Sequence, residues 1–256
     1  MLIKIGKEDF NNCPDKRKIE NSYINARIVI FIKRSTSENL ILTKHIYIFS
    51  GLGADERIFQ KLDFSGFNIS FIRWEVPAKK ETIEQYASRL LIQIKNTRPI
   101  LIGLSFGGLI AIEIAKQIET EKVILIASAK TKKEIPTFYR RGGKLKLQKL
   151  LPIQLLKGKN LFSSWVFKDA SDSEKQLLKS IFSATNDTFL RWAIDTAVSW
   201  ENETCLKNVT HIHGTADRIF PIRFVTCDVK IENGGHLLTL KNAAEISDIL
   251  RTLISK

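Results

Sequence analysis

From residue 44 onward, short apolar runs alternate with amphipathic segments, and this alternation constrains the fold more than any other feature of the sequence. A segment that opens at Thr82, with Gln85 at capping-box spacing, is typical of the predicted helices. Strands that alternate with helices predict an α/β fold, a mostly parallel sheet flanked by helices. The predicted strands lie at 46–49, 69–72, 100–102, 123–127, 209–213 and 229–231.

The alternation stops between residues 130 and 203. This stretch has a helix-like pattern, polar at first and then rich in aromatic residues. Ser171, followed by Glu174, has capping-box spacing and predicts the start of a helix. We interpret 130–203 as a helical cap inserted over one end of the sheet, and 44–129 with 204–256 as the core.

Residues 1–43 do not continue the pattern. They are rich in Asn, Lys and Ile, and only 27–32 is typical of a strand. We favour an N-terminal extension that is disordered or does not belong to the core. The alternative is an additional pair of strands that precedes the sheet.

Several broad classes of protein do not fit the composition. The apolar runs are too short to span a bilayer, and the N-terminus lacks the apolar stretch of a secretory signal. The three cysteines (Cys13, Cys205 and Cys227) are scattered, so they predict neither a disulfide framework nor a metal site. We expect a cytoplasmic protein without stable membrane insertion, metal or organic cofactor. The oligomeric state stays open.

The net charge of +13 is concentrated in one part of the chain. Residues 130–160 hold ten basic residues and one acid, Glu134. We interpret this excess as a solvated lysine-rich surface, with attraction of an acidic substrate or an anionic membrane as the alternative. The sequence carries no nucleic-acid-binding motif, and we expect no nucleic-acid partner.

The stretch IGLSFGG at 102–108 lies where a predicted strand meets a predicted helix. In a G-x-S-x-G turn the serine takes a strained backbone conformation, so the residues two before and two after it must be small. Gly103 and Gly107 meet that demand around Ser105, and Gly108 allows the helix to lie close to the strand. The pattern predicts a nucleophilic serine, and an incidental serine in a tight turn is the alternative.

A nucleophilic serine needs a base, and the chain has four histidines. His45 precedes the first strand, where a surface position is expected. His211 and His213 alternate within an apolar strand, which favours structural roles for both. His236 follows Asn-Gly-Gly beyond the last strand, and a loop there can return to the strand ends, so we predict His236 as the base.

Asp217 is the candidate acid that orients this base. It lies on a loop just past the strand at 209–213. Its alternative role is to cap the turn near Pro221. The order Ser105, Asp217, His236 is the order of nucleophile, acid and base in α/β-hydrolases.

Residues 44–256 resemble a compact α/β-hydrolase with a helical cap. The resemblance implies that Ser105 is the nucleophile, that His236 is general base and then general acid, and that Asp217 orients His236. It rests on three signatures in matching order: GLSFG at 103–107, HGTADRIFP at 213–221 and NGGHLL at 233–238.

The same resemblance implies an oxyanion hole made of two backbone N–H groups. One belongs to the residue after the nucleophile, Phe106. The other comes from the loop after an early strand, where Ser-Gly-Leu-Gly at 50–53 nominates Leu52. The family often has His-Gly at this place and this chain has Ser-Gly, which matters little if backbone groups bind the oxyanion.

These features predict a serine hydrolase that cleaves a small-molecule ester or thioester through an acyl-enzyme. One alternative is a lyase or C–C hydrolase of the same fold, similar to the menaquinone-pathway synthase; another is a hydrolase-like protein that only binds its ligand. Trp165 and Trp192 in the cap are weak candidates for lining the acyl pocket, and packing of the cap onto the sheet is the other expected role.

Overall fold

The computed structural model describes residues 44–146 and 170–255. Residues Lys44–Lys256 belong to one compact unit. The expectations for residues 1–43, including the strand at 27–32, lie outside the described residues, and so does Trp165.

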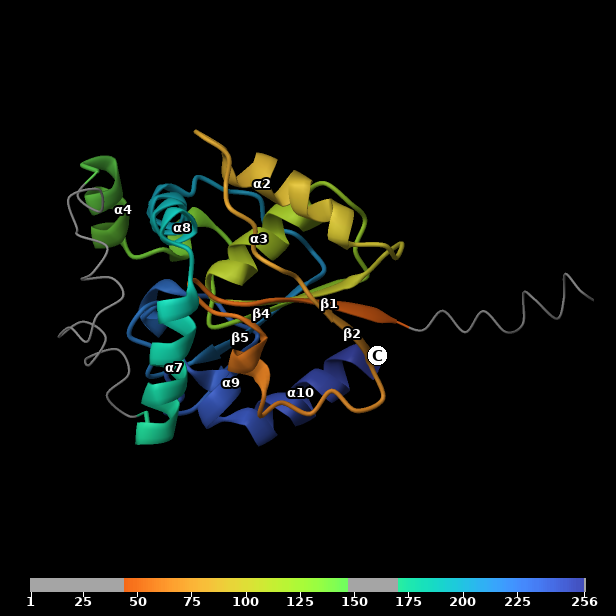
Figure 1. The fold of residues 1–256 in the computed structure, drawn as a ribbon. Helices are drawn as coiled ribbons and strands as arrows, with labels where there is room; N and C mark the ends of the chain where they lie inside the picture. Colours follow the sequence, from red (N-terminus) through yellow and green to blue (C-terminus); the bar gives the residue numbers. More distant parts are fainter. Residues whose placement is uncertain (1–43, 147–169, 256) are drawn as a thin grey trace, which may run out of the picture. The chain divides into compact units, whose positions relative to one another are not determined.

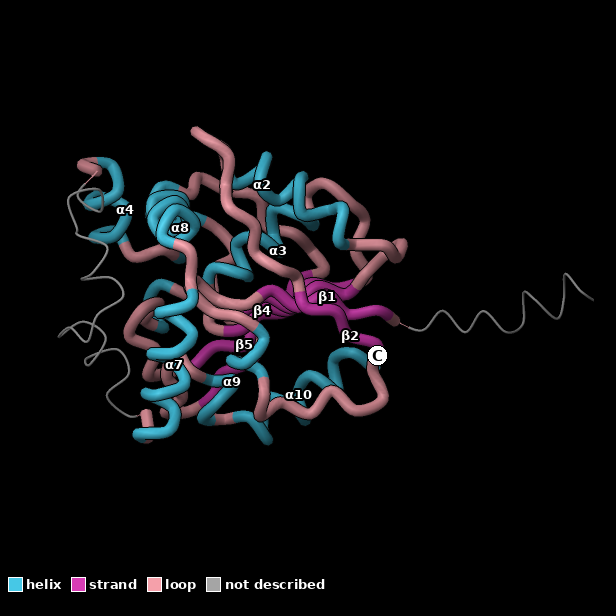
Figure 2. Tube along the Cα trace, in the orientation of Figure 1, coloured by secondary structure: helices cyan, strands magenta, loops and turns pink. Residues whose placement is uncertain are grey.

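Six strands form one sheet in the order β2-β1-β3-β4-β5-β6, shown in magenta in Figure 2. Every neighbouring pair runs parallel, so the predicted parallel sheet is confirmed. The strands are β1 (His45–Phe49), β2 (Asn68–Phe71), β3 (Ile100–Leu104), β4 (Lys122–Ile126), β5 (Val209–Gly214) and β6 (Val229–Ile231).

Helices cover both faces of the sheet (Figure 1). Because successive strand residues point to opposite faces, Tyr47 and Phe49 belong to one apolar layer and Ile46 and Ile48 to the other. The first layer packs against α2 (Ile83–Leu90), α3 (Phe106–Ala115) and α8 (Asp187–Ser199). The second packs against the 3₁₀-helix η1 (Glu56–Phe59), α7 (Asp172–Ala184), α9 (Leu238–Lys241) and α10 (Ala243–Ser255).

Local signals mark several helix boundaries as predicted. Thr82 and Ser171 each form a capping box, at the start of α2 and α7 respectively. Between β1 and β2 the chain forms the short 3₁₀-helix η1. Its buried apolar residues, Ile58 and Phe59, are adjacent in the chain, so a single turn is enough to bury both.

Between β4 and β5 the described residues of the predicted cap form the 3₁₀-helix η3 (Lys132–Glu134) and the helices α4 (Thr137–Lys144), α7 and α8. Trp200 follows α8, and its indole Nε1–H donates a 2.8 Å hydrogen bond to Glu113 of α3. Trp200 is buried, and its bond attaches this part of the chain to α3. In the part of the chain that the structure describes, no helix is long and apolar enough to cross a membrane.

The sheet order reverses direction at β1, which lies between β2 and β3. The segment that follows β1 leads to η1 on one face, whereas β3 leads directly into α3 on the other. In open α/β sheets, the carboxyl ends of strands at such a reversal leave a crevice suited to ligands. The sheet order therefore predicts a ligand site at the residues just after Phe49 and Leu104.

Candidate active site

Ser105 is the residue between β3 and α3. Its backbone has φ 52° and ψ −122°, a conformation that is strained for a residue with a side chain. The turn is held by hydrogen bonds from Ser105 N to Ile126 O (2.9 Å) and from the Ser128 hydroxyl to Ser105 O (2.7 Å). Sequence reasoning did not identify Ser128, because its role depends on β4 lying next to β3.

The glycines around Ser105 are required by close backbone contacts. A Cβ on Gly103 would lie 2.4 Å from the Cα of Gly108, and one on Gly107 would lie 2.3 Å from Ser50 O. A Cβ on Gly108 would lie 2.2 Å from the Ser128 hydroxyl oxygen. The small residues predicted for this turn are therefore needed for the helix to start against the ends of β1 and β3.

His236 lies on the loop after β6 and contacts Ser105. The distance from His236 Nε2 to Ser105 Oγ is 2.9 Å, although the two residues are 131 positions apart. On the other side of the ring, His236 Nδ1 lies 2.8 Å from Asp217 Oδ2. The structure thus brings the three residues of the predicted catalytic set together in one chain of hydrogen bonds.

Asp217 is buried and uses its two carboxylate oxygens differently. Oδ1 accepts hydrogen bonds from the backbone N–H groups of Ile219 (2.8 Å) and Phe220 (2.9 Å), while Oδ2 faces His236. The turn-capping role and the orienting role, which the sequence left as alternatives, are therefore compatible. Burial raises the pKa of Asp217, but the charge and hydrogen bond of His236 outweigh it and hold that pKa below its usual value.

The ionisation of Asp217 decides which atoms donate and which accept in the hydrogen bonds between Asp217, His236 and Ser105. An ionised carboxylate only accepts hydrogen bonds, so His236 Nδ1 carries the proton and donates it to Asp217. His236 Nε2 is then the unprotonated nitrogen and accepts the hydrogen bond of the Ser105 hydroxyl. This is the arrangement in which a histidine can remove the serine proton.

Two loops bring His236 and Asp217 together. The N–H of Ala216 donates a 2.9 Å hydrogen bond to the carbonyl of Gly234. Gly214, at the end of β5, lies so close that an added Cβ would be 2.2 Å from Gly234 O. Gly214 and Gly234 therefore allow the backbones of the two loops to pack directly against each other.

The other three histidines do not contact Ser105. His211 and His213 are fully buried, with their Nε2 and Nδ1 atoms 3.2 Å apart, and His213 Nε2 donates to Phe220 O at 2.7 Å. Burial lowers the pKa of both, most strongly for His211. The structural roles predicted for this pair agree with the contacts. His45 Nε2 lies 2.9 Å from the Ser70 hydroxyl, at the start of β1.

The two N–H groups nominated for an oxyanion hole belong to segments that meet at Ser105. Phe106 is the first residue of α3, and Leu52 lies on the turn after β1. A Cβ on the neighbouring Gly51 would be 3.4 Å from the Cβ of Ser105, so this turn lies directly beside the serine. Within the described residues, neither the Leu52 nor the Phe106 amide donates a hydrogen bond to protein.

Trp192, a weak candidate for the acyl pocket, is partly buried among other rings. Its ring centre lies 4.4 Å from that of Tyr86 and 6.0 Å from that of Phe106. Its indole Nε1–H donates to Glu81 O at 2.8 Å. These contacts attach α8 to α2 and α3, which favours the packing role, and a substrate contact by Trp192 stays a prediction.

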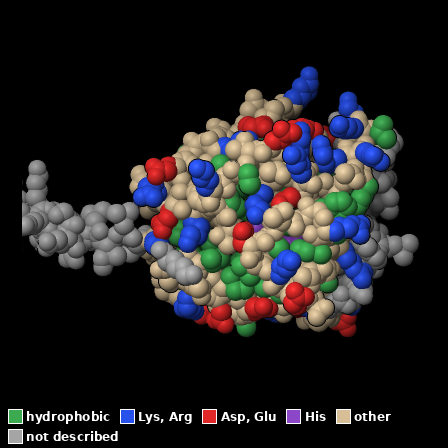
Figure 3. Space-filling view, turned by 180° about the vertical axis from the view of Figure 1, so that it is seen from behind, with side chains coloured by type: hydrophobic (Ala, Val, Ile, Leu, Met, Phe, Trp, Pro, Cys, Tyr) green, Lys and Arg blue, Asp and Glu red, His purple; other side chains and the backbone are tan. Residues whose placement is uncertain are grey.

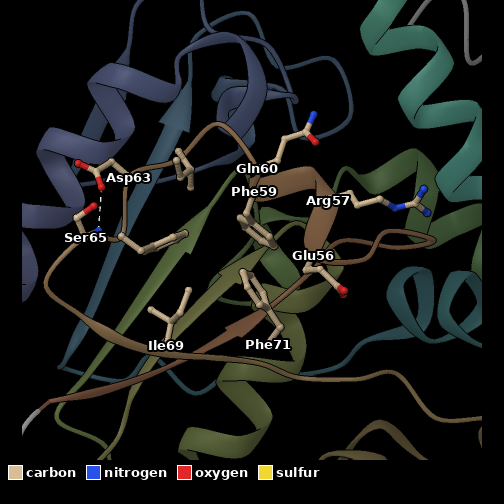
Figure 4. A pocket seen from close by; sticks show the side chains of 10 residues that line it. Glu56, Arg57, Phe59, Gln60, Asp63, Ser65, Ile69 and Phe71 are labelled. Atoms are coloured by element: carbon tan, nitrogen blue, oxygen red, sulfur yellow. Dashed lines mark hydrogen bonds between the residues drawn. The ribbon is translucent and has the colours of Figure 1, made fainter.

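An open cavity of about 520 Å³ lies away from these residues, between η1 and β2 (Figure 4). The rings of Phe59 and Phe71 lie against each other in it, with centres 5.8 Å apart. Ser105, Asp217 and His236 do not line it. In the described residues no cluster of three or more His, Cys, Asp or Glu side chains is arranged to hold a metal ion.

Comparison with known proteins identifies the fold. No family model matches the chain, and no curated protein sequence matches it. Among solved structures, a bromoperoxidase from Bacillus anthracis is 17% identical with a TM-score of 0.59, covering 83% of this chain and 92% of that one.

An enol-lactonase from Burkholderia xenovorans LB400 is 15% identical, with a TM-score of 0.59, and the match covers 84% of this chain and 92% of that one. An esterase from Exiguobacterium antarcticum is 16% identical, with a TM-score of 0.58, and the match covers 83% of this chain and 92% of that one. At these identities the likeness concerns the fold. The chain has the α/β-hydrolase fold.

Proposed function

We propose that the protein is a serine hydrolase that cleaves a small-molecule ester or thioester through an acyl-enzyme. The observation that carries this proposal is the hydrogen-bonded chain from Ser105 through His236 to Asp217, at 2.9 Å and 2.8 Å. Its location at the carboxyl ends of the strands, where the sheet order reverses, also supports an active site. The esterase and the enol-lactonase among the similar structures are consistent with a hydrolase.

In the proposed first step, Ser105 Oγ attacks the carbonyl carbon of the substrate while His236 Nε2 takes the serine proton. Asp217 stabilises the imidazolium that forms, since its own lowered pKa keeps it ionised. The N–H groups of Leu52 and Phe106 bind the oxyanion, and one such donor typically contributes about 3–4 kcal/mol to transition-state stabilisation. The tetrahedral intermediate then collapses, the bond from the carbonyl carbon to the leaving oxygen or sulfur breaks, and His236 gives its proton to the leaving alcohol or thiol.

In the second step, water attacks the acyl group on Ser105. His236 takes a proton from this water, and when the second tetrahedral intermediate collapses, the bond to Ser105 Oγ breaks, His236 returns the proton to that oxygen, and the acid is released. Neither step uses a metal or organic cofactor.

The proposal is tested by replacing the nucleophile. We expect Ser105→Ala to lower the hydrolysis of short p-nitrophenyl esters by a factor on the order of 10³ or more, since the substitution removes covalent catalysis. A fluorophosphonate should label the wild-type protein at Ser105, and an activated ester should give burst kinetics.

Ser199→Ala is the matched control, because Ser199 is exposed on α8 and donates only to the backbone carbonyl of Asp195. It should retain wild-type activity. Retention of most activity in Ser105→Ala would contradict the proposal. Labelling without turnover of esters and thioesters would favour a lyase or C–C hydrolase of the same fold, and binding without labelling would favour a receptor-like protein.

A further inference from the structure

The turn at 50–54, which follows β1 and carries Leu52, is held in place by contacts from three sides. Within the turn, Ala54 N donates to Gly51 O at 3.0 Å, and Gly53 has a φ of +67°. The N–H of Leu52 is proposed to bind the oxyanion. Its contribution to transition-state stabilisation depends on whether this turn keeps a fixed position beside Ser105. We refer to residues 50–54 as the oxyanion turn.

The first contact is made by Ser50, whose side chain is buried. Its hydroxyl donates a 2.6 Å hydrogen bond to Ala54 O and thereby joins the two ends of the oxyanion turn. The same hydroxyl accepts a 2.8 Å hydrogen bond from Trp74 Nε1. Both the donor and an acceptor site of Ser50 are therefore used, and the turn is bonded to Trp74.

The second contact extends from Trp74 to the cap segment. The Trp74 ring stacks on Phe189 of α8, with ring centres 5.4 Å apart, and lies 6.0 Å from the ring of Phe106. Phe106 carries the other N–H proposed for the oxyanion hole. Trp74 therefore contacts Ser50 of the oxyanion turn, Phe106 at the start of α3 and Phe189 in a helix of the predicted cap.

The third contact comes from the end of α7. The hydroxyl of Thr185 lies 2.9 Å from Gly53 O and 3.1 Å from Ile181 O, so it donates to the oxyanion turn while remaining close to its own helix. The ring of Phe182 packs over the same glycine, since a Cβ on Gly53 would be 2.8 Å from Phe182 Cδ1. The cap segment thus touches the turn directly.

We propose that Ser50, Trp74 and Thr185 are positioning residues that hold the Leu52 N–H toward Ser105, so that docking of the cap helices sets the geometry of the oxyanion hole. The inference rests on the proposed hydrolase function. In this chain the oxyanion turn is connected to α7 through the Thr185 hydroxyl and to α8 through the Trp74 ring. Loss of either contact should therefore weaken transition-state binding more than substrate binding.

The test uses Trp74→Phe, which removes the indole N–H and keeps an aromatic ring, and Thr185→Val, which removes the hydroxyl at nearly constant volume. With a p-nitrophenyl ester we expect each to lower kcat by about 10- to 100-fold, because small displacements of catalytic groups have effects of this size. KM should change by less than about two-fold, since ground-state binding does not use the oxyanion hole. Inhibition by a trifluoromethyl ketone, which forms a tetrahedral oxyanion on the serine, should weaken by the same factor as kcat.

Two controls separate positioning from stability. Tyr47→Phe removes a buried hydroxyl outside the cap that donates to Asn96 and accepts from Lys95 N, and Thr252→Val removes a hydroxyl bond to Asp248 O on α10. Tyr47→Phe should lower the melting temperature without changing kcat, and Thr252→Val, at an exposed site, should leave kcat unchanged. Thr185→Ser keeps the hydroxyl and should restore kcat and inhibitor affinity.

If Trp74→Phe and Thr185→Val match these controls in kcat and inhibitor affinity while the wild-type protein is active, the inference is wrong and the hydrolase proposal stands. If the wild-type protein neither hydrolyses any ester nor reacts with a fluorophosphonate at Ser105, the proposed function and the inference are both wrong. A parallel fall in kcat and inhibitor affinity in both variants supports the inference.

Discussion

At the scale of single residues, Ser105 has a backbone conformation of high conformational free energy, and its contacts hold it in that conformation. A positive φ in a residue with a side chain costs on the order of 1–3 kcal/mol and persists only where the surroundings enforce it. Here the Ser105 amide is bonded to β4, its carbonyl accepts from Ser128, and Gly107 lies against the end of β1. The strain exposes Oγ toward His236.

Asp217 leads to a prediction at the same scale. In Asp217→Asn, the amide oxygen can still accept from Ile219 and Phe220, but an NH₂ group then faces His236 Nδ1. The histidine is driven to the tautomer with its proton on Nε2, where it cannot accept the serine proton. We expect kcat for p-nitrophenyl esters to fall by about 10³-fold or more, with a much smaller change in KM.

Asp228→Asn serves as its control, because Asp228 accepts a backbone hydrogen bond from His211 but lies away from the serine. This variant should keep kcat within a few-fold of wild type. If Asp217→Asn retained more than a tenth of the wild-type kcat, Asp217 would have only its turn-capping role. Circular dichroism establishes that both variants are folded.

At the scale of elements, α7 is anchored to the core through Glu174. This buried carboxylate lies 2.8 Å from Lys61 Nζ and 3.5 Å from Lys241 Nζ, and it accepts from Ser171 N at 2.9 Å. Burial raises its pKa, but the bonds to Lys61 and Ser171 outweigh this and lower the pKa to about 2. The capping box that starts α7 therefore also attaches the helix to the segments around η1 and α9.

Glu174→Gln should weaken this attachment. The lysines are partly exposed, so solvent screens the pairs, and we expect a loss of about 1–2 kcal/mol in unfolding free energy. In a chain of this size that corresponds to a fall in melting temperature of about 2–8 °C, measured by calorimetry at pH 7. Because the folded-state pKa is depressed, the contribution is present above the unfolded-state pKa and is lost as the pH falls toward 2.

Glu119→Gln is the comparison for Glu174→Gln. Glu119 pairs with Arg98 at 3.0 Å, but both side chains are largely exposed, and such pairs contribute little to stability. Its melting temperature should stay within about 1 °C of wild type, since exposed pairs typically contribute under 1 kcal/mol. Equal effects of the two substitutions would show that Glu174 does not anchor α7.

At the scale of the whole molecule, the buried pair His211 and His213 predicts how stability depends on pH. Both have lowered pKa values because burial disfavours the charged imidazolium, and the carboxylate of Glu134 lies 4.0 Å from His211 Nδ1 without reversing this. Below the ordinary histidine pKa of about 6.5, the unfolded chain binds protons that the folded protein does not. Stability is therefore lost as the pH falls below that value.

The expected loss between pH 6 and pH 5 is about 1–3 kcal/mol, from up to two extra protons bound by the unfolded chain. Urea unfolding at a series of pH values measures it. His213→Gln should reduce the slope of unfolding free energy against pH by the equivalent of about one bound proton. This holds whatever the effect of the substitution on stability at pH 7. An unfolding free energy that stayed constant from pH 7 to pH 5 would contradict the prediction.

The basic surplus of the sequence is partly neutralised in the structure. Lys132 lies 2.6 Å from Glu201 and 2.7 Å from Glu203, and Lys130 lies 3.4 Å from Asp228. On the face shown in Figure 3, Lys and Arg side chains are interspersed with acidic and apolar ones. A solvated surface remains our interpretation of 130–160, and attraction of an acidic substrate or an anionic membrane remains its alternative.

The sequence by itself determined the succession of strands and helices in 44–129 and 204–255, because the central strands β1, β3 and β4 are apolar runs buried on both faces. It also predicted that Ser105 and His236 form a pair, and the 2.9 Å contact between them agrees with this, since the glycines beside them reflect turns that only small residues allow. Capping boxes located the starts of α2 and α7. Each of these signals depends on residues close together in the chain.

Only the tertiary structure decided how distant segments meet. It showed that Asp217 accepts the backbone bonds of its own turn with one oxygen and faces His236 with the other, and that Trp192 packs on Tyr86 of α2. The bonds of the oxyanion turn join residues 24 and 132 positions apart, from Trp74 to Ser50 and from Thr185 to Gly53. Sequence patterns record local geometry and burial, whereas a partner across the fold depends on which faces pack together, and that is decided when the sheet and its helices assemble.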